Sequence, residues 1–192
     1  MLDYHLFHWA NTFAARHDGF EDPLKAYVQA SEIVFLLGVA ALFLSGSARL
    51  RRAAVAAGLT AGVALGLAHF LASAVNRNRP FVDHPLAHNF LAHANDPGFP
   101  SDHATGAFAI AFALVLRDRK IGIVALFLAL VLSFGRVALG VHYPSDVFAG
   151  AVLGLAAALV LWIRPLRERI DRLADALGRV VSIRTWAPRR SS

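Results

Sequence analysis

Cysteine is absent from this 192-residue sequence, which excludes disulfide bonds and thiolate metal sites. Charged residues are also scarce, at 17% of the chain, and they are clustered in short stretches rather than spread evenly. Hydrophobic residues make up 57%, above the roughly 45–50% that is usual for soluble domains. The composition is therefore that of a membrane protein, and the length suits a single domain over residues 1–192.

The N-terminal stretch lacks both a basic start and a continuous apolar core, so no cleavable signal peptide is expected. It mixes Leu2, Leu6, Phe7 and Trp9 with histidines, a pattern typical of a short amphipathic helix at a membrane surface. The alternative is a partly ordered tail.

Five apolar segments predict an all-α integral membrane protein with five transmembrane helices, at residues 26–46, 53–75, 103–116, 121–135 and 147–163. They form the core of the domain, about residues 26–163, and residues 164–192 form a basic tail. The third and fourth segments are short, since residues 101–116 would span only about 24 Å of a hydrocarbon core about 30 Å thick. Their polar ends should therefore lie recessed below one membrane face.

The positions of Lys and Arg predict the orientation of the bundle. Fourteen of the nineteen fall in residues 47–52, in residues 117–120 and from Arg164 onward, which we place on the cytoplasmic side. Residues 76–102 and 136–146 then share the outer face. Because the basic residues lie between apolar runs, the net charge of +6 suits topology and lipid headgroups, so membrane lipids are expected partners and nucleic acid is not.

The tail predicts a basic amphipathic helix, with apolar residues at helical spacing: Leu166, Ile170, Leu173, Leu177 and Val180. This helix is expected on the cytoplasmic surface, either against lipid or packed on its own bundle.

Three polar stretches share the predicted outer face, and the first is "NRNRPF", residues 76–81. Arg77 and Arg79 could clamp a phosphate, because guanidinium groups match phosphate oxygens in pairs. The alternative is an interfacial arginine pair that reaches lipid headgroups.

The second stretch is "PSDH", residues 100–103, which has the pattern of a helix start. Ser101 is a plausible N-cap and Asp102 falls in the first turn. The N–H groups at such an end attract anions, and His103 can exchange protons near neutral pH. A well-capped helix with an interfacial histidine is the alternative.

The third stretch is "GRVALGVHYPSDV", residues 135–147, with Arg136 at its start. Asp146 is close enough in sequence to reach His142, and a carboxylate on one imidazole nitrogen leaves the other nitrogen available for attack.

Together these stretches predict phosphoryl transfer through a phosphohistidine. The arginines and helix amides would hold the phosphoryl oxygens, one histidine would attack, and the other would protonate the leaving oxygen. No metal or other cofactor is expected, because the arginines supply the positive charge. The spacing of His84, His88 and His93 could also suit a metal, but Pro85 and the loop-like surroundings weaken that alternative.

The three stretches resemble the signature motifs of the type-2 phosphatidic-acid phosphatase superfamily: Lys-x6-Arg-Pro, Pro-Ser-Gly-His and Ser-Arg-x5-His-x3-Asp. The spacing of Arg136, His142 and Asp146 matches the third motif fully. The strings "NRNRPF", "FPSDHATGA" and "GVHYPSDV" further resemble the bacterial undecaprenyl-diphosphatase branch linked to bacitracin resistance.

This resemblance implies a role for each matching residue. His142 would be the nucleophile, Asp146 its orienting partner and His103 the general acid. The phosphoryl oxygens would be bound by Arg79, Ser101 and Arg136, with help from the backbone amides of Asp102 and His103.

The resemblance also implies the reaction: hydrolysis of undecaprenyl diphosphate to undecaprenyl phosphate and phosphate, at the outer face of a bacterial plasma membrane. Phosphatidylglycerol phosphate or phosphatidate is the alternative substrate. A non-catalytic lipid-phosphate carrier would leave the pairing of His142 with Asp146 unexplained, and no oxidant-handling feature supports the related haloperoxidase chemistry. Whether the protein forms a homo-oligomer is left open by the sequence.

Three positions depart from the family pattern. Ala72 stands where the family has its lysine, and we expect Arg77 to substitute for it in substrate binding. Asp102 replaces the motif glycine, as in the bacterial branch, and is counted with the substrate-binding residues. Gly135 replaces the motif serine, which leaves one phosphate contact unaccounted for.

Glu32 lies inside the first predicted transmembrane helix, and an ionisable residue there is a candidate functional group. It could pair with His69 or an arginine, or it could help to manage the second phosphate of the substrate. We count Glu32 with the substrate-binding candidates.

Overall fold

The computed structural model describes residues 2–91 and 96–180. Within these ranges the regular elements are all helices. They are α1 (Leu2–Ala15), α2 (Asp18–Leu44), α3 (Ala48–Val75), α4 (Pro80–Asp83), α5 (Asp102–Arg117), α6 (Arg119–Ala138), α7 (Pro144–Trp162) and α8 (Arg164–Val180).

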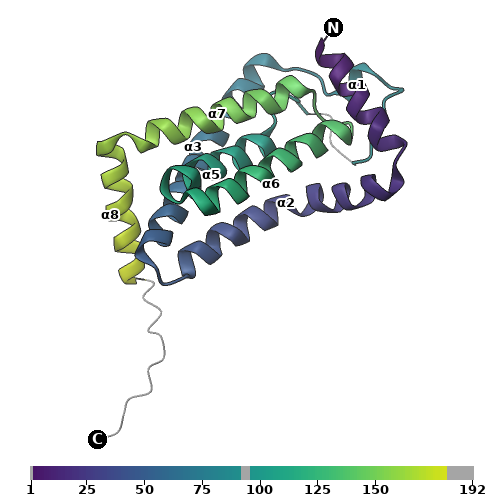
Figure 1. The fold of residues 1–192 in the computed structure, drawn as a ribbon. Coiled ribbons are helices and arrows are strands. Elements are labelled where there is room, and N and C mark those ends of the chain that lie inside the picture. Colours follow the sequence, from purple (N-terminus) through teal and green to yellow (C-terminus); the bar gives the residue numbers. More distant parts are fainter. Residues whose placement is uncertain (1, 92–95, 181–192) are drawn as a thin grey trace, which may run out of the picture.

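Five long helices, α2, α3, α5, α6 and α7, form an up-and-down bundle with α5 at its centre (Figure 1). α5 packs against α3, α6 and α7. α1 lies across one end of the bundle and α8 across the other (Figure 1). The all-α prediction is therefore confirmed.

Four helices in the described ranges are long and apolar enough to cross a membrane, in the segments Gly19–Leu44, Ala48–Asp83, Arg119–Ala138 and Pro144–Trp162. α5, the remaining predicted crossing, has only 16 residues, which is about 24 Å of helix. It can be this short because its neighbours enclose it, and most of its side chains are buried within the bundle.

The three basic stretches predicted to share one side do meet at one end of the bundle. Arg52 forms a two-point ion pair with Asp175 of α8, at 3.0 and 2.7 Å. Arg49 lies 3.2 Å from Asp118, and Arg117 pairs with Asp171. These contacts place the α2–α3 turn, the α5–α6 turn and α8 side by side.

Small residues bring α5 and α7 close together. A Cβ atom at Gly150 would lie 2.8 Å from Thr105 Oγ1, and one at Gly154 would lie 2.6 Å from the amide nitrogen of Ala109. Glycines four residues apart let helices approach to backbone contact. The N-terminal ends of α5 and α7 are therefore adjacent, and the Ser101 amide donates to the Asp146 carbonyl at 3.1 Å.

α1 is a regular helix that packs on the bundle through its buried face. The Asn11 amide donates to the carbonyls of His88 and Ala138, and its oxygen accepts from the His88 amide. Phe7 is fully buried beneath it, whereas Leu2 and Trp9 are exposed. The predicted amphipathic character of this helix is present, and its polar contacts tie it to the loop between α4 and α5.

Candidate active site

His142 lies in the turn between α6 and α7 and is almost completely buried. Its Nδ1 is 2.9 Å from the carbonyl oxygen of Gly98. Its Nε2 is 3.0 Å from Nη1 of Arg79 and 3.2 Å from Nη2 of Arg136. A carbonyl can only accept a hydrogen bond and a guanidinium can only donate one, so the proton sits on Nδ1 and the Nε2 lone pair faces both arginines.

The surroundings also keep this imidazole neutral. Burial, and then the positive charges of Arg136 and Arg79, hold the pKa of His142 well below its usual value. A neutral imidazole with a directed lone pair is a nucleophile, and the two guanidinium groups beside it attract an anionic electrophile.

Asp146 lies in the first turn of α7 and is completely buried. Its Oδ2 accepts from the Tyr143 amide at 2.7 Å and is 3.6 Å from His142 Nδ1. The shortest contact of Nδ1 is therefore with the carbonyl of Gly98, and the Asp146 carboxylate stands close behind it. Gly98 is absent from the sequence-based site because any residue type supplies a carbonyl, so no side-chain signal marks it.

Arg79 reaches His142 from the start of α4, with a side chain that is 6% exposed. Its Nη1 also donates to the Val141 carbonyl at 3.1 Å. Its Nε and Nη2 donate to the two carboxylate oxygens of Asp96, at 3.0 and 3.2 Å. Asp96, which the sequence did not single out, thus places a carboxylate on the outer edge of this guanidinium, where a phosphoryl group would also bind.

Arg136 completes the arginine pair from the last turn of α6 and is also buried. Gly135 beside it explains one departure from the family pattern. A Cβ atom at this position would lie 2.5 Å from Cγ2 of Val28 on α2, so a serine would not fit without movement. The glycine therefore serves the packing of α6 against α2.

Arg77 approaches from the other side of Asp146. Its Nη1 donates to Asp146 Oδ1 at 2.9 Å and to Ser145, its Nη2 donates to Asp3 of α1 at 2.8 Å, and its guanidinium carbon lies 4.3 Å from the centre of the Tyr143 ring. Two carboxylates, those of Asp146 and Asp3, therefore face this guanidinium. The structure thus places Arg77 in a support network behind Asp146, and the family lysine position is occupied by Ala72.

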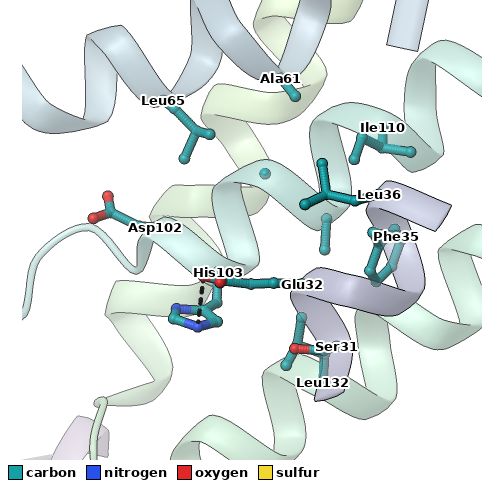
Figure 2. A pocket seen from close by; sticks show the side chains of 12 residues that line it. Ser31, Glu32, Phe35, Leu36, Ala61, Leu65, Asp102, His103, Ile110 and Leu132 are labelled. Carbon is teal, nitrogen blue, oxygen red and sulfur yellow. Dashed lines mark ion pairs between the residues drawn. The ribbon is translucent and has the colours of Figure 1, made fainter. Parts of the chain in front are cut away.

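The N-terminal end of α5 supplies the remaining predicted residues. The Ser101 hydroxyl is buried and accepts from the Ala104 amide at 3.5 Å, as expected for an N-cap. Asp102 is exposed, and its side chain points away from His103 (Figure 2). His103 Nε2 lies 3.1 Å from Oε1 of Glu32, which comes from α2 (Figure 2).

Glu32 therefore contacts His103, while His69 is exposed on α3. His103 is near enough to His142 for its charge to contribute to the lowered pKa of that imidazole. The two predicted histidines thus share one site, with His142 buried between the arginines and His103 at its edge.

A cavity of about 230 Å³ opens beside His103 (Figure 2). Its polar rim includes Glu32 and Asp102, and its walls are apolar residues of α2, α3, α5 and α6: Phe35, Leu36, Ala61, Leu65, Ile110 and Leu132. The cavity therefore joins a polar site to an apolar groove between helices.

The candidate metal histidines are only partly described. His84 contacts the ring of Tyr4 at 4.2 Å between centroids, and the His88 ring stacks on Phe90. His93 lies outside the described residues. In residues 2–91 and 96–180, no three side chains of the metal-binding types converge on one point.

Comparison with known proteins gives both a family and a fold. A family model for the PAP2 superfamily matches residues 53–169. Undecaprenyl-diphosphatase BcrC of Bacillus subtilis (strain 168) is 31% identical over 169 residues, which cover 85% of this chain and 87% of that protein.

Two crystal structures have a similar fold. Aquifex aeolicus LpxE has a TM-score of 0.64 at 23% identity, over 83% of this chain and 94% of that one. The first transmembrane PAP2-type phosphatidylglycerolphosphate phosphatase from Bacillus subtilis has a TM-score of 0.58 at 21% identity, over 93% and 87% of the two chains.

Proposed function

Because the chain belongs to the PAP2 superfamily, as its motifs predicted, we propose that it hydrolyses undecaprenyl diphosphate to undecaprenyl phosphate and phosphate. The observation that carries this proposal is the geometry of His142, whose Nε2 lone pair faces two arginines while Nδ1 donates to a carbonyl. The relative named undecaprenyl-diphosphatase supports the choice of lipid.

In the first step, Arg79, Arg136 and the α5 amides near Ser101 hold the terminal phosphoryl group. Nε2 of His142 attacks phosphorus, an N–P bond forms, and the P–O bond to undecaprenyl phosphate breaks. His103 gives its proton to the leaving oxygen. Asp96 must release Arg79 for this binding, since both anions use the same guanidinium edge.

In the second step, water attacks the phosphohistidine and gives its proton to His103. The N–P bond breaks, phosphate leaves, and both histidines return to their starting state. The ring of His142 is positively charged while it carries the phosphoryl group, and the Gly98 carbonyl and the Asp146 carboxylate stabilise that charge.

The cavity beside His103 provides a route for the lipid. Its apolar walls suit a prenyl chain and His103 lines the same cavity, so the substrate would enter sideways between α2, α3 and α5 with its diphosphate toward His103. Glu32 at the polar rim contacts the proposed acid, and Asp102 also belongs to the rim.

The proposal includes the membrane arrangement. The five helices α2, α3, α5, α6 and α7 cross a bacterial plasma membrane, α1 lies on its outer surface, and the site faces the exterior. The concentration of arginine at the α8 end supports this orientation.

The test is phosphate release by the purified full-length chain from a panel of undecaprenyl diphosphate, phosphatidylglycerol phosphate and phosphatidate. We expect undecaprenyl diphosphate to have the highest kcat/KM. His142→Ala should lower kcat at least about 10³-fold, and His103→Ala about 10²–10⁴-fold. His17→Ala, an exposed histidine on the α1–α2 turn, is the matched control and should remain active.

Two results would contradict the proposal. Retained activity in His142→Ala would exclude His142 as the nucleophile. A higher kcat/KM for a glycerolipid phosphate would exclude undecaprenyl diphosphate as the preferred substrate. A phosphohistidine is hydrolysed in acid but survives in alkali. The intermediate should therefore be sought by quenching the reaction with alkali, with substrate labelled in its terminal phosphate.

A further inference from the structure

A second polar cavity, of about 360 Å³, lies at the end of the bundle opposite His142, where α8 folds across the other helices (Figure 1). We call it the basic pocket, and its lining includes Arg49, Arg52, Arg117, Arg167, Trp162 and Asp171. None of these residues takes part in the proposed phosphatase reaction.

The basic pocket has an excess of positive charge. Three of its arginines form ion pairs with carboxylates, namely Asp118, Asp171 and Asp175. Arg167 instead stacks over the Trp162 ring, with 4.8 Å between its guanidinium carbon and the ring centre. A guanidinium that stacks by its face keeps its N–H edge available for an acceptor.

Arg117 shows that this charge is built into the protein rather than spread on its surface. Its side chain is only 9% exposed, and its guanidinium carbon also lies 5.7 Å from the centre of the Trp162 ring. Four guanidinium groups around a cavity with three nearby carboxylates leave a net positive site, which suits an anion with several oxygen atoms.

The position of the basic pocket identifies the source of that anion. Trp162 ends the membrane-spanning segment of α7, and tryptophan favours the level of the lipid headgroups. α8 buries Ile170 and Ala174 against the bundle but exposes Leu173, Leu177 and Val180. This exposed apolar edge suits contact with hydrocarbon, so the pocket opens at headgroup depth rather than into bulk water.

We propose that the basic pocket binds the phosphate of an anionic glycerophospholipid. Pockets of arginine between membrane helices recognise such headgroups, and a zwitterionic headgroup would bring its own positive charge toward the arginines. This site is independent of the phosphatase reaction and would hold a lipid of the opposite leaflet.

Fluorescence quenching of Trp162 tests the proposal directly. The chain has three tryptophans, so Trp9→Phe and Trp186→Phe together leave Trp162 as the reporter. The full chain is reconstituted in phosphatidylcholine vesicles that contain a brominated lipid as the quencher. This lipid is either phosphatidylglycerol or phosphatidylcholine, in each case brominated near the glycerol end of its acyl chains. We expect brominated phosphatidylglycerol to quench at a mole fraction about 5- to 10-fold lower, since each nearby arginine contributes roughly a few-fold preference.

Matched variants separate a site from general surface charge. Arg49→Gln with Arg167→Gln should abolish the preference for phosphatidylglycerol. Arg169→Gln with Arg172→Gln removes the same charge from exposed positions on α8 and should preserve it. If the first pair fails to fold, Arg167→Gln alone removes the guanidinium over Trp162 without breaking an ion pair among residues 2–91 and 96–180, and it should still weaken the preference.

Three outcomes would overturn the proposal. Equal quenching by the two brominated lipids would exclude headgroup selection. An equal loss of the phosphatidylglycerol preference in both variant pairs would show that general surface charge causes it. Relief of quenching by millimolar inorganic phosphate would assign the basic pocket to a free anion instead of a lipid.

Discussion

At the residue scale, the chemistry depends on which nitrogen of His142 carries the proton. The Gly98 carbonyl fixes it on Nδ1, and the two arginines leave Nε2 as an acceptor. The same arginines that would bind the phosphoryl group also keep the nucleophile neutral. In the proposed mechanism, substrate binding and activation of the nucleophile are therefore functions of one cluster.

This coupling predicts a shift in pH dependence for Arg136→Gln. Burial and the arginine charges lower the pKa of His142, so removal of one positive charge should raise it. Activity falls as pH drops through this pKa, because protonated His142 cannot attack. The acid limb of kcat/KM should therefore move to higher pH by about one unit, in addition to a loss of about 10²–10³-fold in rate.

The measurement is the pH profile of phosphate release for the wild type and for Arg136→Gln. Both are assayed with the same substrate, so that ionisation of the substrate affects the two profiles equally. Arg172→Gln on α8 is the control. An unchanged acid limb in Arg136→Gln would show that His142 does not determine it.

Glu32 provides a second prediction at this scale. Its carboxylate lies 3.1 Å from Nε2 of His103, so we expect it to orient the acid. Glu32→Gln should lower kcat about 10-fold, because misplacement of the acid weakens proton transfer to the leaving oxygen. In a His103→Ala background the same substitution should have no further effect.

A double-mutant cycle on kcat measures this dependence. Glu168→Gln, an exposed acid on α8, is the control. Additive losses from Glu32→Gln and His103→Ala would show that Glu32 acts on the substrate directly.

At the element scale, α1 is joined to the active site through Asp3. Asp3 accepts from the amide and hydroxyl of Ser145 and from Arg77, and Arg77 in turn contacts Asp146. Partial burial opposes the ionisation of Asp3, but its hydrogen bonds outweigh this and lower its pKa. Helix α1 thus supports the carboxylate behind the proposed nucleophile.

Asp3→Asn should therefore lower kcat by about 10-fold with little change in KM, because Arg77 and Asp146 lose a fixed charge that holds them in place. Steady-state kinetics on the purified variant checks this, with Asp22→Asn at the exposed start of α2 as the control. A loss of thermal stability with an unchanged kcat would indicate that Asp3 serves only to attach α1.

At the scale of the whole molecule, the two ends of the bundle differ in chemistry. One end collects His142, His103 and the buried arginine pair, and the other collects the arginines of α8 and of its neighbouring turns. This asymmetry is the basis for the proposed orientation, because basic residues are enriched on the cytoplasmic side.

The absence of cysteine makes this orientation easy to test. We expect Leu86→Cys, at a 98% exposed position in the loop after α4, to react with a membrane-impermeant maleimide in intact spheroplasts. Arg172→Cys on α8 should react only after permeabilisation. The reverse pattern would place the active site in the cytoplasm.

The sequence by itself determined the helical architecture, the two ends of the bundle and the residues of the three motifs. These follow from hydrophobic periodicity, charge placement and short-range spacing, all of which are local. It did not determine the contacts of His142 with Gly98, of His103 with Glu32 or of Arg79 with Asp96. Only the tertiary structure decided these, because they join segments far apart in the chain, and a backbone carbonyl has no residue-type signal.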